Sequence, residues 1–173
     1  MEIKRVWAMP TSNTFDCKPI YEFVHKYLNA SKVSIDPFAR NKKWATYTND
    51  LNPDTKADSH TYATTFLEKL IKDNVHADLI IFDPPYSFGQ AKECYQRFGE
   101  WKFRDTQNVT RWTDEKKLCD KLLTRDGVFL HFGWSTNGLG KKYNMKIIEI
   151  LIVAHGSAHN DTLCMAEQRT GLF

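Results

Sequence analysis

The chain has 173 residues, of which 42% are hydrophobic and 26% charged, a composition typical of one soluble globular domain. No stretch approaches the roughly 18 uninterrupted apolar residues of a membrane-spanning helix. The N-terminal segment MEIKRVWAMPTSNTF lacks the apolar core of a signal peptide, so the sequence predicts a cytoplasmic protein without a membrane partner. The net charge of +3 permits a polyanionic partner without requiring one.

The cysteines and histidines show no metal-ligand spacing. The four cysteines are widely scattered, with no CxxC pair, which favours reduced thiols over a disulfide framework. The six histidines include no HExxH arrangement, and His155 and His159 fall in a segment that has the composition of a turn. The sequence therefore predicts no metal site.

Helices and strands are predicted to alternate along the chain. Apolar residues three and four apart indicate amphipathic helices, and short apolar runs indicate buried strands. In chain order we expect a helix over 18–28, strands over 32–36 and 44–50, a helix over 61–73, a strand over 77–82, a helix over 113–123 and a strand over 127–133.

The C-terminal segment 145–168 contains two apolar runs joined by Gly, Ser, Asn and Asp, which predicts an antiparallel hairpin. Together with the alternating elements before it, this hairpin indicates a doubly wound, mostly parallel α/β sheet with an antiparallel C-terminal hairpin at its edge. In such sheets, ligands bind outside the carboxyl ends of the strands.

Three of the predicted strands end in an acid: Asp36, Asp50 and Asp83. An acid after the second strand of a nucleotide-binding unit typically accepts hydrogen bonds from ribose hydroxyls, the role expected of Asp50. The alternative is that Asp50 belongs to a polar turn before the next helix. The segment Asp36-Pro37-Phe38 is expected where backbone amides meet a cofactor's charged part, or else is a plain turn.

The segment Asp83-Pro84-Pro85-Tyr86 directly follows the apolar strand 77–82. Two successive prolines hold an extended backbone that cannot donate hydrogen bonds. A carboxylate and an aromatic ring stand at its two ends. The alternative interpretation is a proline-rich turn in which Tyr86 packs in the core.

These residues carry a resemblance to the DNA amino-methyltransferases. The chain matches that family's catalytic signature, [DNS]-Pro-Pro-[YFW], in the Asp form most common among enzymes that methylate adenine N6. Further segments of residues 7–169 resemble the family's other motifs in one of its permuted orders. The resemblance implies a Rossmann-like class I methyltransferase, with residues 1–173 forming a single catalytic domain without a separate target-recognition domain.

The same resemblance implies the cofactor and the site residues. The cofactor is S-adenosylmethionine, and Asp83, Pro84, Pro85 and Tyr86 are the catalytic residues. Where the family has Phe-x-Gly-x-Gly, this chain reads Phe38-Ala39-Arg40-Asn41-Lys42. The implied cofactor-binding residues are Phe15, Lys18, Pro19, Asp36, Pro37, Phe38, Asp50, Leu51 and Asp83.

The implied reaction is methyl transfer to the exocyclic N6 amine of a flipped adenine in DNA. Asp83 and the Pro84 carbonyl would each accept one amine hydrogen, and Tyr86 would stack on the base. Cytosine N4, RNA adenine and, with less support, a protein amide are alternative substrates. A non-catalytic binding module that retains the fold is an alternative of another class.

Residues 87–113 are a candidate DNA-contacting insertion, because basic and aromatic residues alternate there. The alternative is an ordinary amphipathic surface with buried tryptophans. A homodimer or a separate recognition subunit would supply further DNA contacts. The candidate DNA-binding residues are Arg97, Trp101, Lys102, Arg104 and Arg111.

Overall fold

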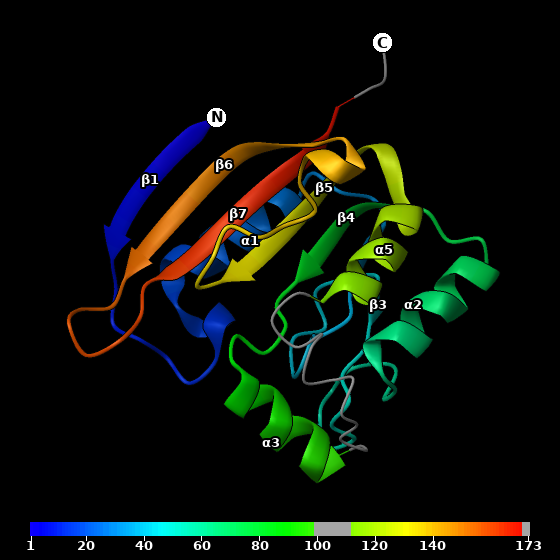
Figure 1. Cartoon of the computed structure of the whole chain (residues 1–173), viewed down its shortest axis with the longest axis horizontal. Coiled ribbons are helices and arrows are strands. Elements are labelled where there is room, and N and C mark those ends of the chain that lie inside the picture. Colours follow the sequence, from blue (N-terminus) through cyan, green and yellow to red (C-terminus); the bar gives the residue numbers. More distant parts are fainter. Residues whose placement is uncertain (99–111, 171–173) are drawn as a thin grey trace.

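A computed structural model describes residues 1–98 and 112–170. They contain a seven-stranded sheet with the strand order β1-β6-β7-β5-β4-β2-β3 (Figure 1). Strand β7 is antiparallel to both of its neighbours, and all other neighbouring strands are parallel. The strands are β1 (Glu2–Trp7), β2 (Ser34–Asp36), β3 (Tyr47–Thr48), β4 (Ala77–Phe82), β5 (Leu123–Gly133), β6 (Met145–Ala154) and β7 (Thr162–Arg169).

Helices cover both faces of this sheet. Helix α1 (Lys18–Leu28) lies on one face, while α2 (Ala63–Lys72) and α5 (Thr113–Leu122) lie on the other (Figure 1). Helix α3 (Phe88–Phe98) lies beyond the carboxyl end of β4. Within the described ranges, no helix has both the length and the apolar character needed to cross a membrane.

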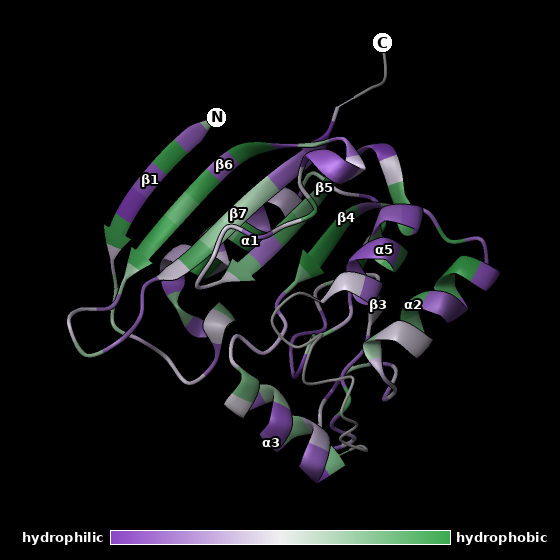
Figure 2. Cartoon of the chain, viewed as in Figure 1, coloured by the Kyte–Doolittle hydropathy of each residue, from purple (hydrophilic) through white to green (hydrophobic). Residues whose placement is uncertain are grey.

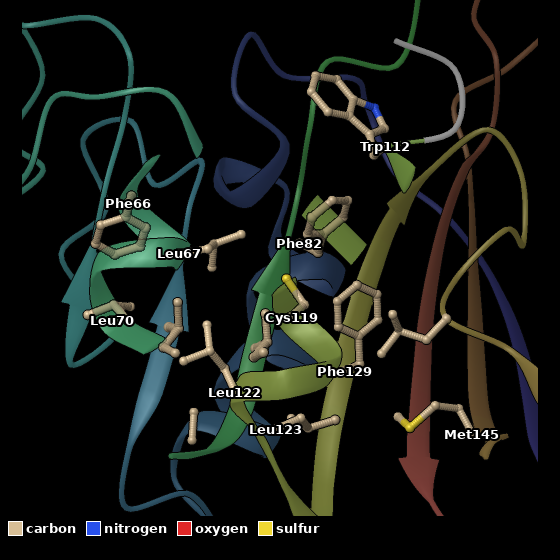
Figure 3. Packing of buried hydrophobic residues seen from close by; sticks show 14 residues of the cluster. Phe66, Leu67, Leu70, Phe82, Trp112, Cys119, Leu122, Leu123, Phe129 and Met145 are labelled. Atoms are coloured by element: carbon tan, nitrogen blue, oxygen red, sulfur yellow. The ribbon is translucent and has the colours of Figure 1, made fainter. Parts of the chain in front are cut away.

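The helix periodicity in the sequence produces the core layer between the sheet and the helices α2 and α5. Phe66, Leu67 and Leu70 project from α2, and Cys119 and Leu122 project from α5, so that each helix turns one apolar stripe towards β4 and β5 (Figure 3). Figure 2 shows the same division, with hydrophilic residues on the outer sides of these helices. The doubly wound α/β architecture predicted from the sequence is confirmed.

The predicted edge position of the C-terminal hairpin is wrong. Strands β6 and β7 do pair antiparallel, but β1 adds to β6 in parallel, from Glu2 opposite Glu149 to Trp7 opposite Ala154. The sequence does not indicate β1, because most of its residues are exposed and its strand conformation comes from pairing with β6.

The strand predicted over 44–50 shortens to the two residues of β3. Side chains replace the backbone ladder just before it: the Ser34 amide donates to Thr46 Oγ1 at 3.1 Å, and the Thr46 amide donates to Ser34 Oγ at 3.0 Å. Such hydroxyl contacts compete with regular strand pairing, so the pairing of β2 and β3 is irregular at its amino end.

A buried carboxylate holds the loop that follows β5. Glu167 of β7 accepts hydrogen bonds from the backbone amides of Leu139 at 2.6 Å and Gly140 at 2.9 Å. Burial raises the pKa of Glu167, and these two amides partly offset the rise. Gly138 lies so close that a Cβ there would be 2.0 Å from Glu167 Oε2 and 2.6 Å from Met165 Cε. A side chain at position 138 would therefore have to displace the ends of Glu167 and Met165, both of which are buried.

We expect Gly138→Ala to lower the free energy of unfolding by about 1–3 kcal/mol, because the added methyl group must displace Glu167 or Met165. The matched control is Gly89→Ala in α3, where the nearest atom to a Cβ is 3.9 Å away. That control should leave stability unchanged or raise it by about 0.5–1 kcal/mol. Urea unfolding measures both, and equal midpoints for the two variants would contradict the packing described.

Candidate functional site

The carboxyl ends of β2, β3 and β4 meet at one edge of the sheet, beside a cavity of about 650 Å³. Asp50 and Asp83 line this cavity. Asp36 lies behind it with 2% exposure. Burial raises the pKa of Asp36 well above its ordinary value, and the carboxylates of Asp83 and Asp50 add to the rise. The three acids thus converge as the sequence predicted.

The cavity wall comes from segments far apart in the chain. It includes the N-terminal stretch before α1, the loops after β2, β3 and β4, one side of α3 along most of its length, the residue after β5 and the β6–β7 turn. Lining residues that the sequence did not indicate as cofactor-binding or catalytic include Thr14, Arg40, Asn49, Gln90, Trp134 and His155.

The Asp83–Tyr86 segment folds back on its own acid. Tyr86 Oη donates a hydrogen bond to Asp83 Oδ1 at 2.5 Å, and Thr14 Oγ1 lies 3.2 Å from Tyr86 Oη. The Tyr86 amide donates to Gln90 Oε1 at 2.9 Å. Within residues 1–98 and 112–170, no group donates to the Pro84 carbonyl. One oxygen of Asp83 is thus held by Tyr86, while the carbonyl of Pro84 remains available as an acceptor.

The environment of Asp83 brings its titration close to neutral pH. Burial raises the pKa of Asp83 to about 6, against the lowering effects of the hydrogen bonds with Tyr86 and Thr14 and of the positive charge on Arg40. The pKa of Tyr86 rises well above its usual value through burial and through the charge of Asp83. Above pH 6 the site therefore holds an ionised Asp83 beside a protonated Tyr86.

Asp50 has a structural role that the sequence left open. Its Oδ2 accepts the Arg40 amide at 3.0 Å and its Oδ1 accepts the Asn52 amide at 2.9 Å, so it ties the loop after β2 to the turn after β3. Buried Asn49 strengthens the same junction by donating to the carbonyls of Pro37 and Thr61. Each oxygen of Asp50 can still accept a further hydrogen bond, and the residue lines the cavity.

The predicted cofactor residues divide into two groups. Pro37, Phe38, Asp50, Leu51 and Asp83 line the large cavity, and Phe15 lines a smaller one beside it. Lys18, Pro19 and Asp36 line neither.

The first turn of α1 explains two of these positions. Lys18 is exposed, and its Nζ lies 3.8 Å from Oε1 of Glu22, one turn further along the helix. Pro19 fills an early position of α1, which suits proline because the first amides of a helix have no intrahelical partner. The Lys-Pro pair thus starts the helix and does not reach either cavity.

The structure places one of the candidate DNA-binding residues. Arg97 lines the cavity and lies over the ring of Phe98, with 4.9 Å from its guanidinium carbon to the ring centroid. Trp101, Lys102, Arg104 and Arg111 lie outside the described residues. Trp112 is buried at 5% exposure, with its ring centroid 5.4 Å from that of Phe38. At this position the buried-tryptophan interpretation is the correct one.

Trp134 is the lining residue with the clearest missed signal. It directly follows β5, at the carboxyl edge where ligands of such sheets bind. Its side chain is 46% exposed, and its ring lies 5.9 Å from that of Tyr86 at an interplanar angle of 70°. An aromatic residue directly after the predicted strand 127–133 is a signal that the sequence alone contains.

No protein-family model matches the chain, and no curated protein matches it. Among solved structures it is similar to yhhF of Escherichia coli, an inferred methyltransferase, with a TM-score of 0.55 and 10% identity over 95% of this chain and 92% of that one. It is also similar to SMU.1697c of Streptococcus mutans, an inferred methyltransferase in complex with SAH, with a TM-score of 0.51 and 12% identity over 86% and 96% of the two chains.

A third similar structure is NSun6 of Pyrococcus horikoshii with SFG, with a TM-score of 0.54 and 13% identity over 83% of this chain and 50% of that one. The chain spans about half the length of several such structures, including 48% of SMU.776. At these identities the likeness establishes the fold. The chain has the Rossmann-like fold of class I methyltransferases.

We expect the Asp83 carboxyl to titrate with a midpoint of about 6. A ¹³C NMR titration of aspartate-labelled protein would measure it. Tyr86→Phe should move the midpoint upward, because it removes a hydrogen bond to the ionised form. Tyr21→Phe, at an exposed tyrosine of α1 outside the cavity lining, should leave it unchanged. A midpoint near 4, or a downward shift in Tyr86→Phe, would contradict the geometry.

Proposed function

We propose that the chain is an S-adenosylmethionine-dependent methyltransferase whose target is the exocyclic N6 amine of adenine in DNA. The observation that carries the proposal is the Asp83-Pro84-Pro85-Tyr86 segment at the carboxyl end of β4, which borders the large cavity with a partly buried carboxylate and an unused carbonyl. This is the acceptor pair that an amine with two hydrogens needs.

The residues around the cavity fit the proposed cofactor. Asp50 has the position of an acid that accepts hydrogen bonds from ribose hydroxyls. Phe38, Leu51 and Tyr62 offer apolar and aromatic surface for an adenine ring. Similar folds occur in complex with SAH and with SFG, which supports the same ligand class here. When bound, S-adenosylmethionine supplies an electrophilic methyl group on a sulfonium.

The chemistry of the chain's own residues is alignment and proton handling. An adenine amine is a weak nucleophile, because its lone pair is delocalised into the ring. Asp83 Oδ2 and the Pro84 carbonyl would each accept one amine hydrogen, which localises the lone pair on nitrogen. The rigid Pro84-Pro85 backbone would fix the orientation of the Pro84 carbonyl. The hydrogen bond from the Tyr86 hydroxyl to Asp83 Oδ1 fixes the orientation of the carboxylate.

The same carboxylate can hold the proton that the methylated amine releases. With a pKa of about 6, Asp83 is a stronger base than an ordinary aspartate, and at neutral pH it remains mostly ionised.

We expect the transfer rate to rise as the pH increases through about 6, because Asp83 ionises in that range.

The base would lie against aromatic side chains at the cavity mouth. Because the Tyr86 hydroxyl is tied to Asp83, the ring of Tyr86 is fixed in place, and the exposed ring of Trp134 stands across from it. Stacking on such rings contributes about 1–3 kcal/mol per base. Cytosine N4 and RNA adenine present the same amine chemistry, so the experiment below includes them.

We expect purified protein, incubated with methyl-labelled S-adenosylmethionine and unmethylated genomic DNA, to produce N6-methyladenine detectable by nucleoside mass spectrometry. Asp83→Ala should lower the transfer rate by at least about 10²-fold while S-adenosylhomocysteine binding survives. Asp73→Asn, an exposed acid at the end of α2 that pairs with Lys69, is the matched control and should retain full activity.

Each other outcome has a definite meaning. N4-methylcytosine, or methyladenine only in RNA, would replace the proposed substrate and keep the reaction class. Binding of S-adenosylhomocysteine without methylation of any nucleic acid would refute the nucleic-acid substrate. Absence of binding would leave the non-catalytic module as the better interpretation. Equal rates in Asp83→Ala and the intact protein would refute the role of Asp83.

A further inference from the structure

Arg40 takes a backbone conformation that few arginines adopt. It has φ of 51°, in the left-handed region where a Cβ is strained and glycine is favoured. Its amide donates to Asp50, and the neighbouring Ala39 amide donates to the Asn49 carbonyl at 2.8 Å. These bonds hold the loop in place. Strained residues of this type persist where the surrounding structure fixes them, and they are common at ligand-binding sites.

Arg40 is an exposed residue that borders two cavities. Arg40 lines the large cavity and also a smaller one of about 70 Å³, which has room for a few water-sized groups. Both cavities share Thr14, Phe38, Arg40 and Asp83. A molecule with its bulky end in the large cavity and its tail in the small one would therefore pass Asp83.

The guanidinium of Arg40 has no hydrogen bond or salt bridge with any residue in the described ranges. The other cation of the small cavity is already engaged, because Lys42 Nζ donates to Asp16 Oδ1 at 2.6 Å and lies 5.2 Å from the centroid of the Trp44 ring. Arg40 is exposed and borders this cavity, which is too small for a ring system, so its guanidinium donors are accessible to a ligand there. A planar fork of donors matches a carboxylate.

We infer that Arg40 binds the α-carboxylate at the amino-acid end of the cofactor, with that end in the small cavity and the adenosine in the large one. The inference rests on the proposed function, because it assigns a further contact to the same cofactor. It explains why a strained arginine stands in a loop where glycine would be easier to accommodate. It also places the sulfur, which joins the two ends of that molecule, beside Asp83.

Calorimetric titration with two ligands tests the inference. One is S-adenosylhomocysteine, and the other is its decarboxylated form, which lacks only the α-carboxylate. We expect the intact protein to prefer the first by about 10- to 100-fold, the usual range for a charge-assisted hydrogen bond. In Arg40→Ala that preference should shrink to about 3-fold or less, because affinity for the decarboxylated ligand is unaffected by the loss of the guanidinium.

Two further variants separate binding from folding. Arg40→Gly removes the side chain and relieves the backbone, so its urea midpoint should equal or exceed that of the intact protein while the carboxylate preference is lost. Lys43→Ala removes one positive charge next to the loop, at a residue that pairs with Asp58 and lines neither cavity. Lys43→Ala should keep the preference, which excludes a general effect of net charge.

The failures of the two proposals are distinguishable. If the intact protein binds both ligands equally, or Arg40→Ala keeps the preference, the role of Arg40 is refuted and the cofactor proposal stands. If the intact protein binds neither ligand, the cofactor proposal fails and the inference about Arg40 fails with it.

Discussion

The parallel pairing of β2, β3 and β4 is the constraint on which the site depends. Parallel strands end at the same edge of a sheet, so the acids that follow them converge without contact in sequence. Where the strand ends meet, the surrounding protein excludes water from the carboxylates. This burial raises the pKa values of Asp36 and Asp83. Tyr86, Thr14 and the amide of Phe38 then satisfy the acids locally. The chemistry of the cavity is a consequence of strand direction.

The loop after β2 links the support of the site to its electrostatics. Asp50 holds the Arg40 amide and so keeps a strained residue in place. The charge of Arg40 in turn offsets part of the rise that burial causes in the Asp83 pKa. The Asp50 carboxylate therefore holds the backbone at Arg40, while Arg40 and Asp83 both line the cavity. Such strain is tolerated because the junction around Asn49 is fully hydrogen-bonded.

Residues whose role depends on local sequence could be predicted, and residues whose role depends on distant neighbours could not. The Asp83–Tyr86 segment was found because its prolines, acid and ring are consecutive. The hydrogen bond from Tyr86 to Asp83 could not be predicted, because the sequence does not show which side-chain rotamers the two residues adopt. Lys18 and Pro19 were selected by resemblance, yet they start α1 and lie outside both cavities. The sequence showed Arg40 only as one residue of the segment that replaces the family's Phe-x-Gly-x-Gly motif.

The sequence by itself determined the alternation of elements, the antiparallel hairpin, and the placing of an acid at each of three strand ends, because hydrophobic period and turn composition are local properties. Only the tertiary structure decided that β1 closes the sheet beside β6, that Trp112 is a core residue, and that Trp134 faces Tyr86. It also decided that Arg40 borders two cavities. These features arise from contacts between segments distant in the chain, and burial and hydrogen bonding there outweigh the local preferences of each residue.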